Sequence, residues 1–388
     1  MTTTTNLSRQ SALDAVERLR PVIEAHRDAA EQERRVAAPV IEAMQKEGMF
    51  KLWLPKEYGG FELDFPSYLE VVRALSTIDP SVGWIQANTG TSATQAALLP
   101  EAGAREVFGS GALTAGSITP RGRAIPVEGG YRVSGQWPLA SGCHFAEWLG
   151  GNCLVFEGEV PRLGPGGAPD FTLMFVPRSE CRILDTWYST GMRGTGSTDY
   201  VVEDVFVPEH RTFPLFTAQS RLASPLYKIR IEMLFLTALA NVGLGIARAA
   251  IDSFVELAKA KTPTLSQDGL ATRPTIHAEV ARAEALHQAA VSSLHDVARQ
   301  IDTAVTTGDS VPDDLEAKRR LACVFAAEAC EKVVDSMYRL GGVSSIYQGH
   351  RLDRCLRDIH TVNQHLAVNP VWWEKTGQYY FGLGLGMP

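Results

Sequence analysis

The sequence predicts an α+β protein with an α-helical N-terminal domain, a central antiparallel β-domain and a C-terminal four-helix bundle. Three observations support this class. Apolar residues recur at helical spacing in residues 1–112, short runs with a period of two fill residues 113–218, and long alanine-rich helical stretches fill residues 219–388. Helices and strands are therefore segregated along the chain, whereas in a doubly wound sheet they alternate.

The N-terminal domain is predicted from helical periodicity and from residues that are typical of helix starts and ends. The stretch "SALDAVERLRPVIEAHRDAAEQERRVAAPVIEAMQKEG" has apolar residues three and four positions apart, and its last residue, Gly48, suits the end of a helix. Two further stretches, "FPSYLEVVRALSTID" and "PSVGWIQANTGTSATQAALLP", each have a proline in the first turn, where its missing N–H costs nothing. We therefore expect several helices before residue 112.

The β-domain is predicted from alternation. In "YRVSGQW", Tyr131, Val133 and Trp137 share one face of a strand and polar residues occupy the other. Similar runs are "NCLVFEGEV", "DFTLMFVP" and "TDYVVEDVFVP". Glycine and proline between these runs indicate turns, so we expect a small antiparallel sheet or barrel.

The C-terminal bundle is predicted from three helical stretches of roughly 30 residues each. They begin near Leu226, Thr275 and Asp313, and "HRLDRCLRDIHTVNQHLA" supplies a fourth helix. The most apolar run, "MLFLTALANVGLGIA", contains Asn241 and is shorter than the roughly 20 residues that a bilayer requires. It is interpreted as a buried helix, so no membrane is expected. The alanine-rich faces favour close packing, and a homotetramer assembled through the bundles is predicted.

Composition excludes several functions. The chain has 388 residues, 45% of them hydrophobic, and a net charge of −7, which argues against a nucleic-acid partner or an acidic membrane surface. Its six cysteines form no CxxC pair, which is typical of reduced thiols, and the first residues lack a secretory signal, so a cytoplasmic location is expected. No GxGxxG follows a strand and no GxxxxGK(S/T) occurs, so Rossmann and P-loop nucleotide sites are not predicted.

Four motifs in this order resemble the acyl-CoA dehydrogenase superfamily of flavoproteins. They cover nearly the whole chain, and the resemblance implies the three-domain fold described above. The motifs are "LWLPKEYGGFELDFPSYLEVVRALSTIDPSVGW", "GSITPRGRAIPVEGGYRVSGQWPLASG", "GMRGTGSTDYVVEDVFVPEHR" and "LGGVSSIYQGHRLDRCLRDIHT".

The resemblance implies flavin contacts in "GQWPLASG". Trp137 would cover the flavin, Pro138 and Leu139 would lie along the same strand edge, and Ser141 would hydrogen-bond near flavin N5. In the alternative interpretation, Trp137 is a core residue of the barrel and Ser141 forms a turn.

Three other segments are further candidates for flavin contacts. Ser117 resembles a flavin- or substrate-facing position, although a serine at a strand end also satisfies backbone groups. Thr195 and Ser197 lie in the glycine-rich "GTGST", whose backbone amides can approach a cofactor oxygen. Arg273 opens a helix and could meet a flavin phosphate, or it is an ordinary surface residue.

The residues that are missing indicate the reaction. An acyl-CoA dehydrogenase needs a carboxylate base, but residues 348–369 contain no glutamate. The chain instead resembles the flavin-dependent monooxygenase branch, through "WPLASGCHFAEW" and "LRDIHTVNQH". That branch implies a two-component enzyme, which receives reduced flavin (FMN or FAD) from a separate NAD(P)H-dependent reductase. In that branch the oxygenase lets the reduced flavin react with O₂ to give a C4a-(hydro)peroxide, and it then oxygenates a small aromatic or heteroaromatic compound. The alternatives are an acyl-CoA dehydrogenase or oxidase with Glu232 as base, and a catalytically idle flavin-fold scaffold.

The histidines complete the predicted site. The resemblance places the catalytic histidine at His365, where it would stabilise the flavin peroxide or take a substrate proton, a role that suits a group titrating near neutrality. On a single helix, His360 would point about 140° away, toward packing or solvent, so the two make a poor metal pair and no metal is predicted. His144 is a second catalytic candidate. A packing role remains open for both His365 and His144. Related hydroxylases often carry another histidine on the helix after "GW", where this chain offers only Asn88, Thr91 or Ser92.

Overall fold

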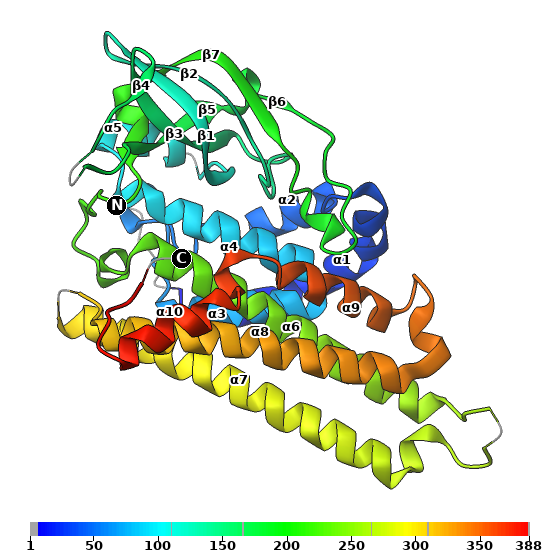
Figure 1. Ribbon diagram of the computed structural model, residues 1–388. Helices are drawn as coiled ribbons and strands as arrows, with labels where there is room; N and C mark the ends of the chain where they lie inside the picture. Colours follow the sequence, from blue (N-terminus) through cyan, green and yellow to red (C-terminus); the bar gives the residue numbers. More distant parts are fainter. Residues whose placement is uncertain (1–6, 110, 165–166, 265, 309, 387–388) are drawn as a thin grey trace.

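The N-terminal region and the sheet domain lie one above the other in the computed structural model, which describes residues 7–109, 111–164, 167–264, 266–308 and 310–386. Figure 1 shows the β-domain above a layer of N-terminal helices, with the C-terminal helices beneath. The N-terminal helices are α1 (Arg9–Glu33), α2 (Ala38–Lys46), α3 (Phe65–Ile78), α4 (Pro80–Thr94) and α5 (Glu101–Phe108).

The first helical stretch is two helices rather than one. Arg34 ends α1 in the left-handed conformation, with φ 58°, and a proline in the first turn starts α2. Gly48 follows α2 at φ 74°, as predicted for a residue that must adopt this conformation at a helix end. Asp79 separates α3 from α4, and its carboxylate accepts from the backbone N–H of Ser81 at 2.8 Å. This cap fixes the start of α4, which lies directly under the sheet.

The sheet contains strands of very different length. They are β1 (Thr114–Val127), β2 (Gly130–Trp137), β3 (Trp148–Glu157), β4 (Val160–Pro161), β5 (Phe171–Pro177), β6 (Arg182–Ile183), β7 (Tyr200–Pro208) and β8 (Thr212–Pro214). The order is β6-β7-β2-β1-β3-β5-β8, with β4 paired to β3. The helix-to-strand change therefore falls between Phe108 and Thr114, and the change back to helix falls between Pro214 and Ile231.

The expectation of an antiparallel sheet needs one correction, because β1 and β3 pair in parallel. The strand β2 returns antiparallel to β1, and β3 then lies on the opposite edge of β1. The connecting residues 138–147 must therefore pass beneath one end of β1. This crossover carries "PLASGCHFAE", and its position under the sheet brings it next to α4.

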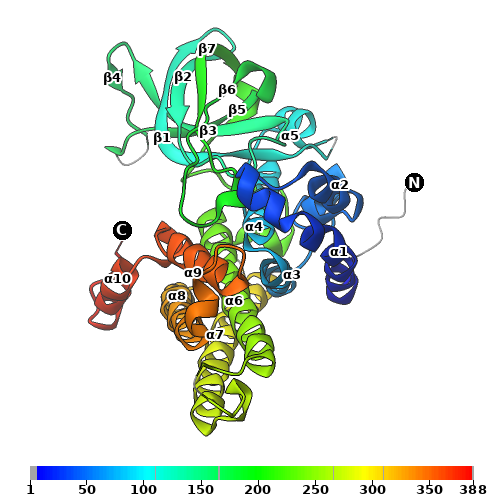
Figure 2. The same cartoon turned by 90° about the vertical axis from the view of Figure 1, so that its right-hand side faces the viewer.

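The C-terminal helices are α6 (Ile231–Ala260), α7 (Pro274–Thr307), α8 (Asp313–Gly341), α9 (Arg351–Val362) and α10 (Val371–Tyr380). Figure 2 shows α6 to α9 side by side and α10 outside them, next to α8. The helix α6 is long and apolar enough to cross a membrane by length and composition, but 89% of its most apolar window is buried inside the molecule. It is a core helix, as predicted.

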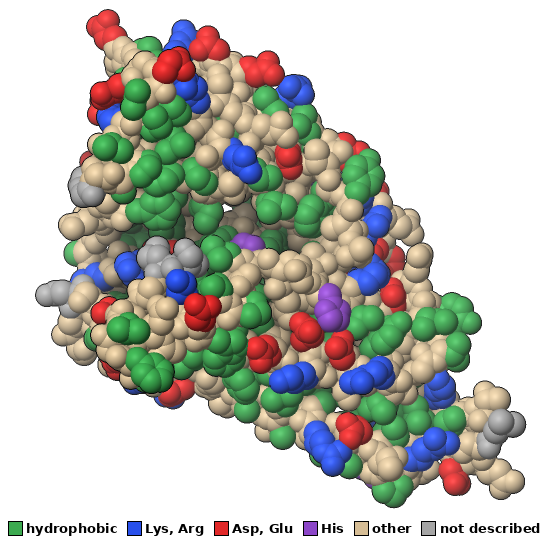
Figure 3. All heavy atoms as spheres, viewed as in Figure 1, with side chains coloured by type: hydrophobic (Ala, Val, Ile, Leu, Met, Phe, Trp, Pro, Cys, Tyr) green, Lys and Arg blue, Asp and Glu red, His purple; other side chains and the backbone are tan. Residues whose placement is uncertain are grey.

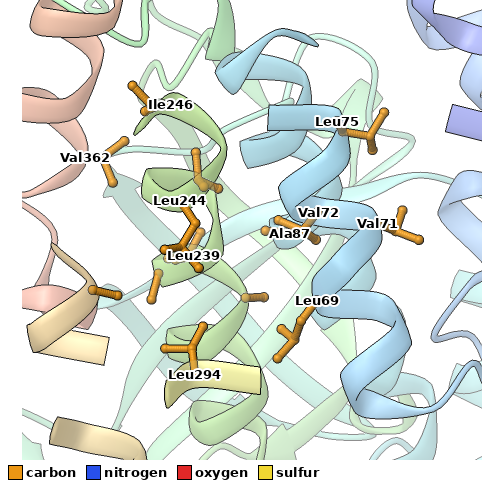
Figure 4. Close-up of a cluster of buried hydrophobic side chains, with 14 of the residues drawn as sticks. Leu69, Val71, Val72, Leu75, Ala87, Leu239, Leu244, Ile246, Leu294 and Val362 are labelled. Carbon is orange, nitrogen blue, oxygen red and sulfur yellow. The ribbon is translucent and has the colours of Figure 1, made fainter. Parts of the chain in front are cut away.

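The core joins the N-terminal helices to the bundle. Figure 4 shows part of it, where Leu69 of α3, Leu239 of α6 and Leu294 of α7 belong to one cluster of buried side chains. Each is at most 2% exposed, and burying a leucine contributes about 1.5–3 kcal/mol. Since α3 and α4 pack on α6, the helix layer under the sheet is held by the bundle.

Candidate functional site

Helix α4 has one open face in an otherwise buried helix. Its only partly exposed residues are Trp84, Asn88 and Ser92, which are spaced four apart and therefore share a face. This face lies toward the β-domain, because Thr114 of β1 donates a hydrogen bond to Ser92 Oγ at 2.7 Å. Figure 3 shows a hollow between the β-domain and the helices below it, with a histidine side chain inside. The open face of α4 is therefore one wall of a candidate site.

A row of hydroxyl groups connects α4 to the crossover. The Trp84 indole N–H donates to Ser141 Oγ at 3.0 Å, and Ser141 Oγ lies 2.6 Å from Ser197 Oγ. Ser197 Oγ is also 2.6 Å from Thr195 Oγ1, which donates to the Met192 carbonyl at 2.9 Å. The structure thus brings Ser141 together with Thr195 and Ser197, which the sequence proposed from a separate segment 54 to 56 positions further along the chain.

His365 lies on the same side of α4, but not on the helix predicted for it. Helix α9 ends at Val362, and His365 precedes the short helical turn Leu366–Val368. The prediction that His360 and His365 lie on one helix was therefore wrong, and the angle derived from it does not apply. The His365 ring meets the edges of Trp84 at 5.5 Å and Phe235 at 5.7 Å between ring centroids. His365 and Ser141 are thus two neighbours of the same tryptophan.

The hydrogen bonding of His365 fixes its tautomer. The backbone N–H of Ala367 donates to Nδ1 at 3.0 Å, so Nδ1 is an acceptor and the neutral ring carries its proton on Nε2. Burial lowers the pKa of His365 to about 4. At neutral pH this histidine is therefore an uncharged Nε2–H donor. This pKa lies well below neutrality, so the hydrogen-bond role suits His365 better than the role of base.

The other two predicted histidine positions have different surroundings. His360 is exposed, with Nε2 3.1 Å from an Asp335 carboxylate oxygen, in agreement with its predicted place at the surface. His144 sits so close to Gly196 that a Cβ there would approach its ring to 2.9 Å. Burial, followed by the charge of nearby Arg35, lowers the pKa of His144. This environment agrees with the packing interpretation of His144.

The remaining crossover residues present an apolar edge. Leu139 is 55% exposed and adopts φ 62°, a strained conformation for a residue with a Cβ. Pro138 beside it is partly exposed. Ser117 is 9% exposed on β1, and its Oγ accepts from the Thr119 backbone N–H at 3.3 Å. An exposed leucine in an unusual backbone conformation thus stands two residues before Ser141, the first hydroxyl of the row.

Trp137 does not lie where a flavin cover was predicted. Its indole is 1% exposed, stacks on Tyr200 at 5.1 Å between ring centroids and donates to the Asn152 carbonyl at 2.8 Å. Small residues make room for it, since a Cβ on Gly122 or Gly151 would approach the indole within 3 Å. The structure therefore supports the alternative, a core residue of the β-domain.

Arg273 and Glu232 are not brought to the hollow in this chain. Arg273 directly precedes α7, and Figure 1 shows that α7 begins at the end of the bundle away from the β-domain. Glu232 is exposed in the first turn of α6, where its carboxylate pairs with Arg230 at 3.0 Å. An exposed, paired carboxylate is a poor candidate for the base of a dehydrogenase, which must work in a water-excluded site.

Trp84 and Phe235 were missed as site residues. Trp84 stands in the quoted motif "SVGW", four residues before Asn88, and that spacing was the available signal. Asn88 donates to the Trp84 carbonyl at 2.8 Å, so its amide N–H₂ is engaged within α4. Thr91 is 4% exposed and bonds within the helix, which leaves Ser92 as the other open polar residue of the three proposed there.

A buried charge cluster holds the site together. Arg354 of α9 is 7% exposed and donates to Asp79 Oδ2 at 2.9 Å. It also lies 3.6 Å from the Asp358 carboxylate, which accepts from the Met192 backbone N–H at 2.5 Å. Asp79 caps α4, and Met192 ends the hydroxyl row. One arginine therefore connects the start of α4 to the end of the hydroxyl row.

These residues fit a flavin ring. An isoalloxazine has one polar edge and one apolar edge, and the crossover carries the Ser141 hydroxyl two residues after the exposed side chain of Leu139. The strained φ of Leu139 is of the kind found where a backbone is shaped around a ligand. In the described residues no cluster of three or more metal-binding side chains occurs, so a metal centre has no ligand set there.

Comparison with known proteins gives consistent matches. Residues 5–106 match the acyl-CoA dehydrogenase N-terminal domain, and residues 237–370 match the acyl-CoA dehydrogenase C-terminal domain. Indole-3-acetate monooxygenase of Pseudomonas putida is 32% identical over 91% of this chain and 89% of its own length. The flavin-dependent monooxygenase oxygenase subunit HsaA of Mycobacterium tuberculosis is 29% identical over 100% and 99%.

The fold comparison agrees with the sequence matches. XiaF from Streptomyces, solved in complex with FADH2 and glycerol, superposes with a TM-score of 0.90 at 28% identity, covering 98% of this chain and 97% of that one. The identity and coverage are high enough to assign the whole chain, rather than one part of it, to a family. The chain belongs to the acyl-CoA dehydrogenase superfamily and, within it, to the flavin-dependent monooxygenases.

Proposed function

We propose that this protein is the oxygenase of a two-component system that binds reduced flavin in the hollow over α4 and oxygenates a small aromatic or heteroaromatic compound. The observation that carries the proposal is the convergence of Ser141 and His365 on Trp84 from different parts of the chain. Bound flavin supplies the activation of O₂. The protein's own groups supply a hydroxyl for the flavin edge and a neutral N–H donor across from it.

The arrangement separates an oxygenase from a dehydrogenase. Residues 348–369 hold no glutamate, and Glu232 is exposed and paired with Arg230. His365 has Phe235 of α6 as a neighbour, so α6 contributes an aromatic ring beside this histidine. An aromatic wall beside a hydrogen-bond donor suits a flat aromatic substrate. The relatives named for indole-3-acetate and for flavin-dependent oxygenation support this substrate class.

The supply of flavin and the assembly follow from the same proposal. A relative described as an oxygenase subunit supports a separate NAD(P)H-dependent flavin reductase, working by diffusion or brief contact in the cytoplasm. Arg273 contributes to the flavin site only if a second copy of the chain supplies it, which fits a homotetramer built through the bundles. Sedimentation at micromolar concentration tests the assembly, and a stable monomer would contradict it.

Oxygen transfer is the direct test of the reaction. The protein is mixed with chemically reduced FMN or FAD, isotopically labelled O₂ and a panel of indoles, phenols and acyl-CoA thioesters. We expect an aromatic product that contains one labelled oxygen atom, formed only when reduced flavin is present. Flavin reduction by an acyl-CoA, without any labelled aromatic product, would instead assign the protein to the dehydrogenases.

A further inference from the structure

The hydroxyl row beneath the flavin site has a fixed direction. Its first member, the Trp84 indole, can only donate, and its last, the Met192 carbonyl, can only accept. Thr195 gives its one proton to Met192, so Ser197 must give its proton to Thr195. Ser141 must then give its proton to Ser197, since each hydroxyl has one.

This direction leaves Ser141 as an acceptor only. Its oxygen receives the Trp84 N–H and gives its proton to Ser197, so the one position still open is a lone pair. The three hydroxyl residues are 2–6% exposed, so bulk water has little access to reverse the row. The Met192 carbonyl is held in place by the Met192 N–H bond to Asp358, and Trp187 donates to the same carbonyl at 3.2 Å.

We infer that Thr195 and Ser197 make the site selective for reduced over oxidised flavin, by orienting Ser141 so that it can only accept a hydrogen bond. The inference rests on the proposed function, which places flavin N5 beside Ser141. Reduced flavin carries a hydrogen on N5 and donates to that lone pair. Oxidised flavin has no hydrogen on N5, so the N5 lone pair faces the lone pair of Ser141 Oγ. Two buried acceptors without a donor between them weaken the binding of oxidised flavin.

Selectivity for the reduced form matters for an oxygenase without its own reductase. Spent, oxidised flavin must leave before the next reduced flavin enters. Ser197 and Thr195 are positioning residues in this account, since they act on the flavin through Ser141. The measurable quantity is the ratio of the dissociation constants for oxidised and reduced flavin.

Two variants break the row at different places. Ser197→Ala removes the acceptor for the Ser141 proton, and Thr195→Val lets Ser197 turn its proton back toward Ser141. In both, the Ser141 proton becomes free to point at the ligand and to bond the bare N5 of oxidised flavin. We expect the ratio of oxidised to reduced dissociation constants to fall about tenfold in each, the effect of one hydrogen bond gained or misdirected.

Matched controls separate orientation from general damage. Thr195→Ser keeps the hydroxyl and should keep the wild-type ratio. Ser189→Ala removes a nearby hydroxyl outside the row, which donates to the Gly191 carbonyl at 2.7 Å, and should also leave the ratio unchanged. Titrations use oxidised FMN or FAD in air, and the dithionite-reduced flavin under anaerobic conditions, so no turnover is required.

The outcomes distinguish this inference from the proposed function. Ser141→Ala should weaken reduced-flavin binding several-fold. If it does, but the ratio is unchanged in both Ser197→Ala and Thr195→Val, the orienting role is wrong and the flavin position stands. If Ser141→Ala changes the binding of neither flavin form, flavin N5 is not beside Ser141, and both the proposed position and the inference are overturned.

Discussion

Replacing His365 with alanine is expected to leave reduced-flavin binding within a few-fold of the wild type while product formation falls about 10²- to 10³-fold. The reason is the loss of one preorganised N–H donor in a site where water cannot replace it. The electrons of the reduced flavin should then appear as hydrogen peroxide. Product and peroxide formed per reduced flavin, measured in single-turnover experiments, give both quantities.

The matched control for this variant is His360→Ala. His360 is exposed on α9 and faces Asp335, so its loss should leave coupling at the wild-type level. Because burial lowers the pKa of His365 to about 4, wild-type coupling should also be flat between neutral pH and pH 6 as far as this group is concerned. Equal coupling in His365→Ala and the wild type would assign His365 to packing.

Replacing Arg354 with methionine is expected to lower the free energy of unfolding by about 3–5 kcal/mol. The side chain is buried, pairs with Asp79 and lies within 4 Å of carboxylate oxygens of Glu31 and Asp358. Methionine fills most of the volume but leaves these carboxylates without their cation in a low-dielectric environment. Guanidinium chloride unfolding, followed by circular dichroism, measures the loss.

Arg299→Met is the control for the arginine replacement. Arg299 pairs with Asp296 on the exposed face of α7, at 2.7 Å, and an exposed pair of this kind contributes about 0–1 kcal/mol. The two variants remove the same side chain from one buried and one exposed pair. A similar small loss in both would show that the buried cluster does not hold α4 and the Met192 loop in place.

Local sequence patterns predicted the helices and strands well where the structure of a segment depends mainly on its own residues. The alternation in "YRVSGQW" placed Trp137 on the same face as Val133, and both are buried in the β-domain. The pattern does not say which layer that face meets, so the flavin-cover role of Trp137 could not be tested from the sequence. The parallel pairing of β1 with β3 depends on a crossover between distant segments and has no local signal.

Individual residues of the site could be predicted from the sequence, but the contacts between them could not. Ser141, Thr195 and Ser197 came from short motifs, but their contact depends on two loops that meet only in the folded chain. The end of α9 at Val362 has no glycine or proline beside it, so the helix was predicted to continue through His365. The role of Trp84 depends on a partner 57 residues away in the chain.

The most direct test of the account is a crystal structure of the complex with reduced flavin, prepared without oxygen. We expect the ring to lie in the hollow over α4, with N5 within hydrogen-bond distance of Ser141 Oγ and with His365 facing the ring. A ring bound elsewhere, or bound in the hollow with N5 turned away from Ser141, would contradict the account.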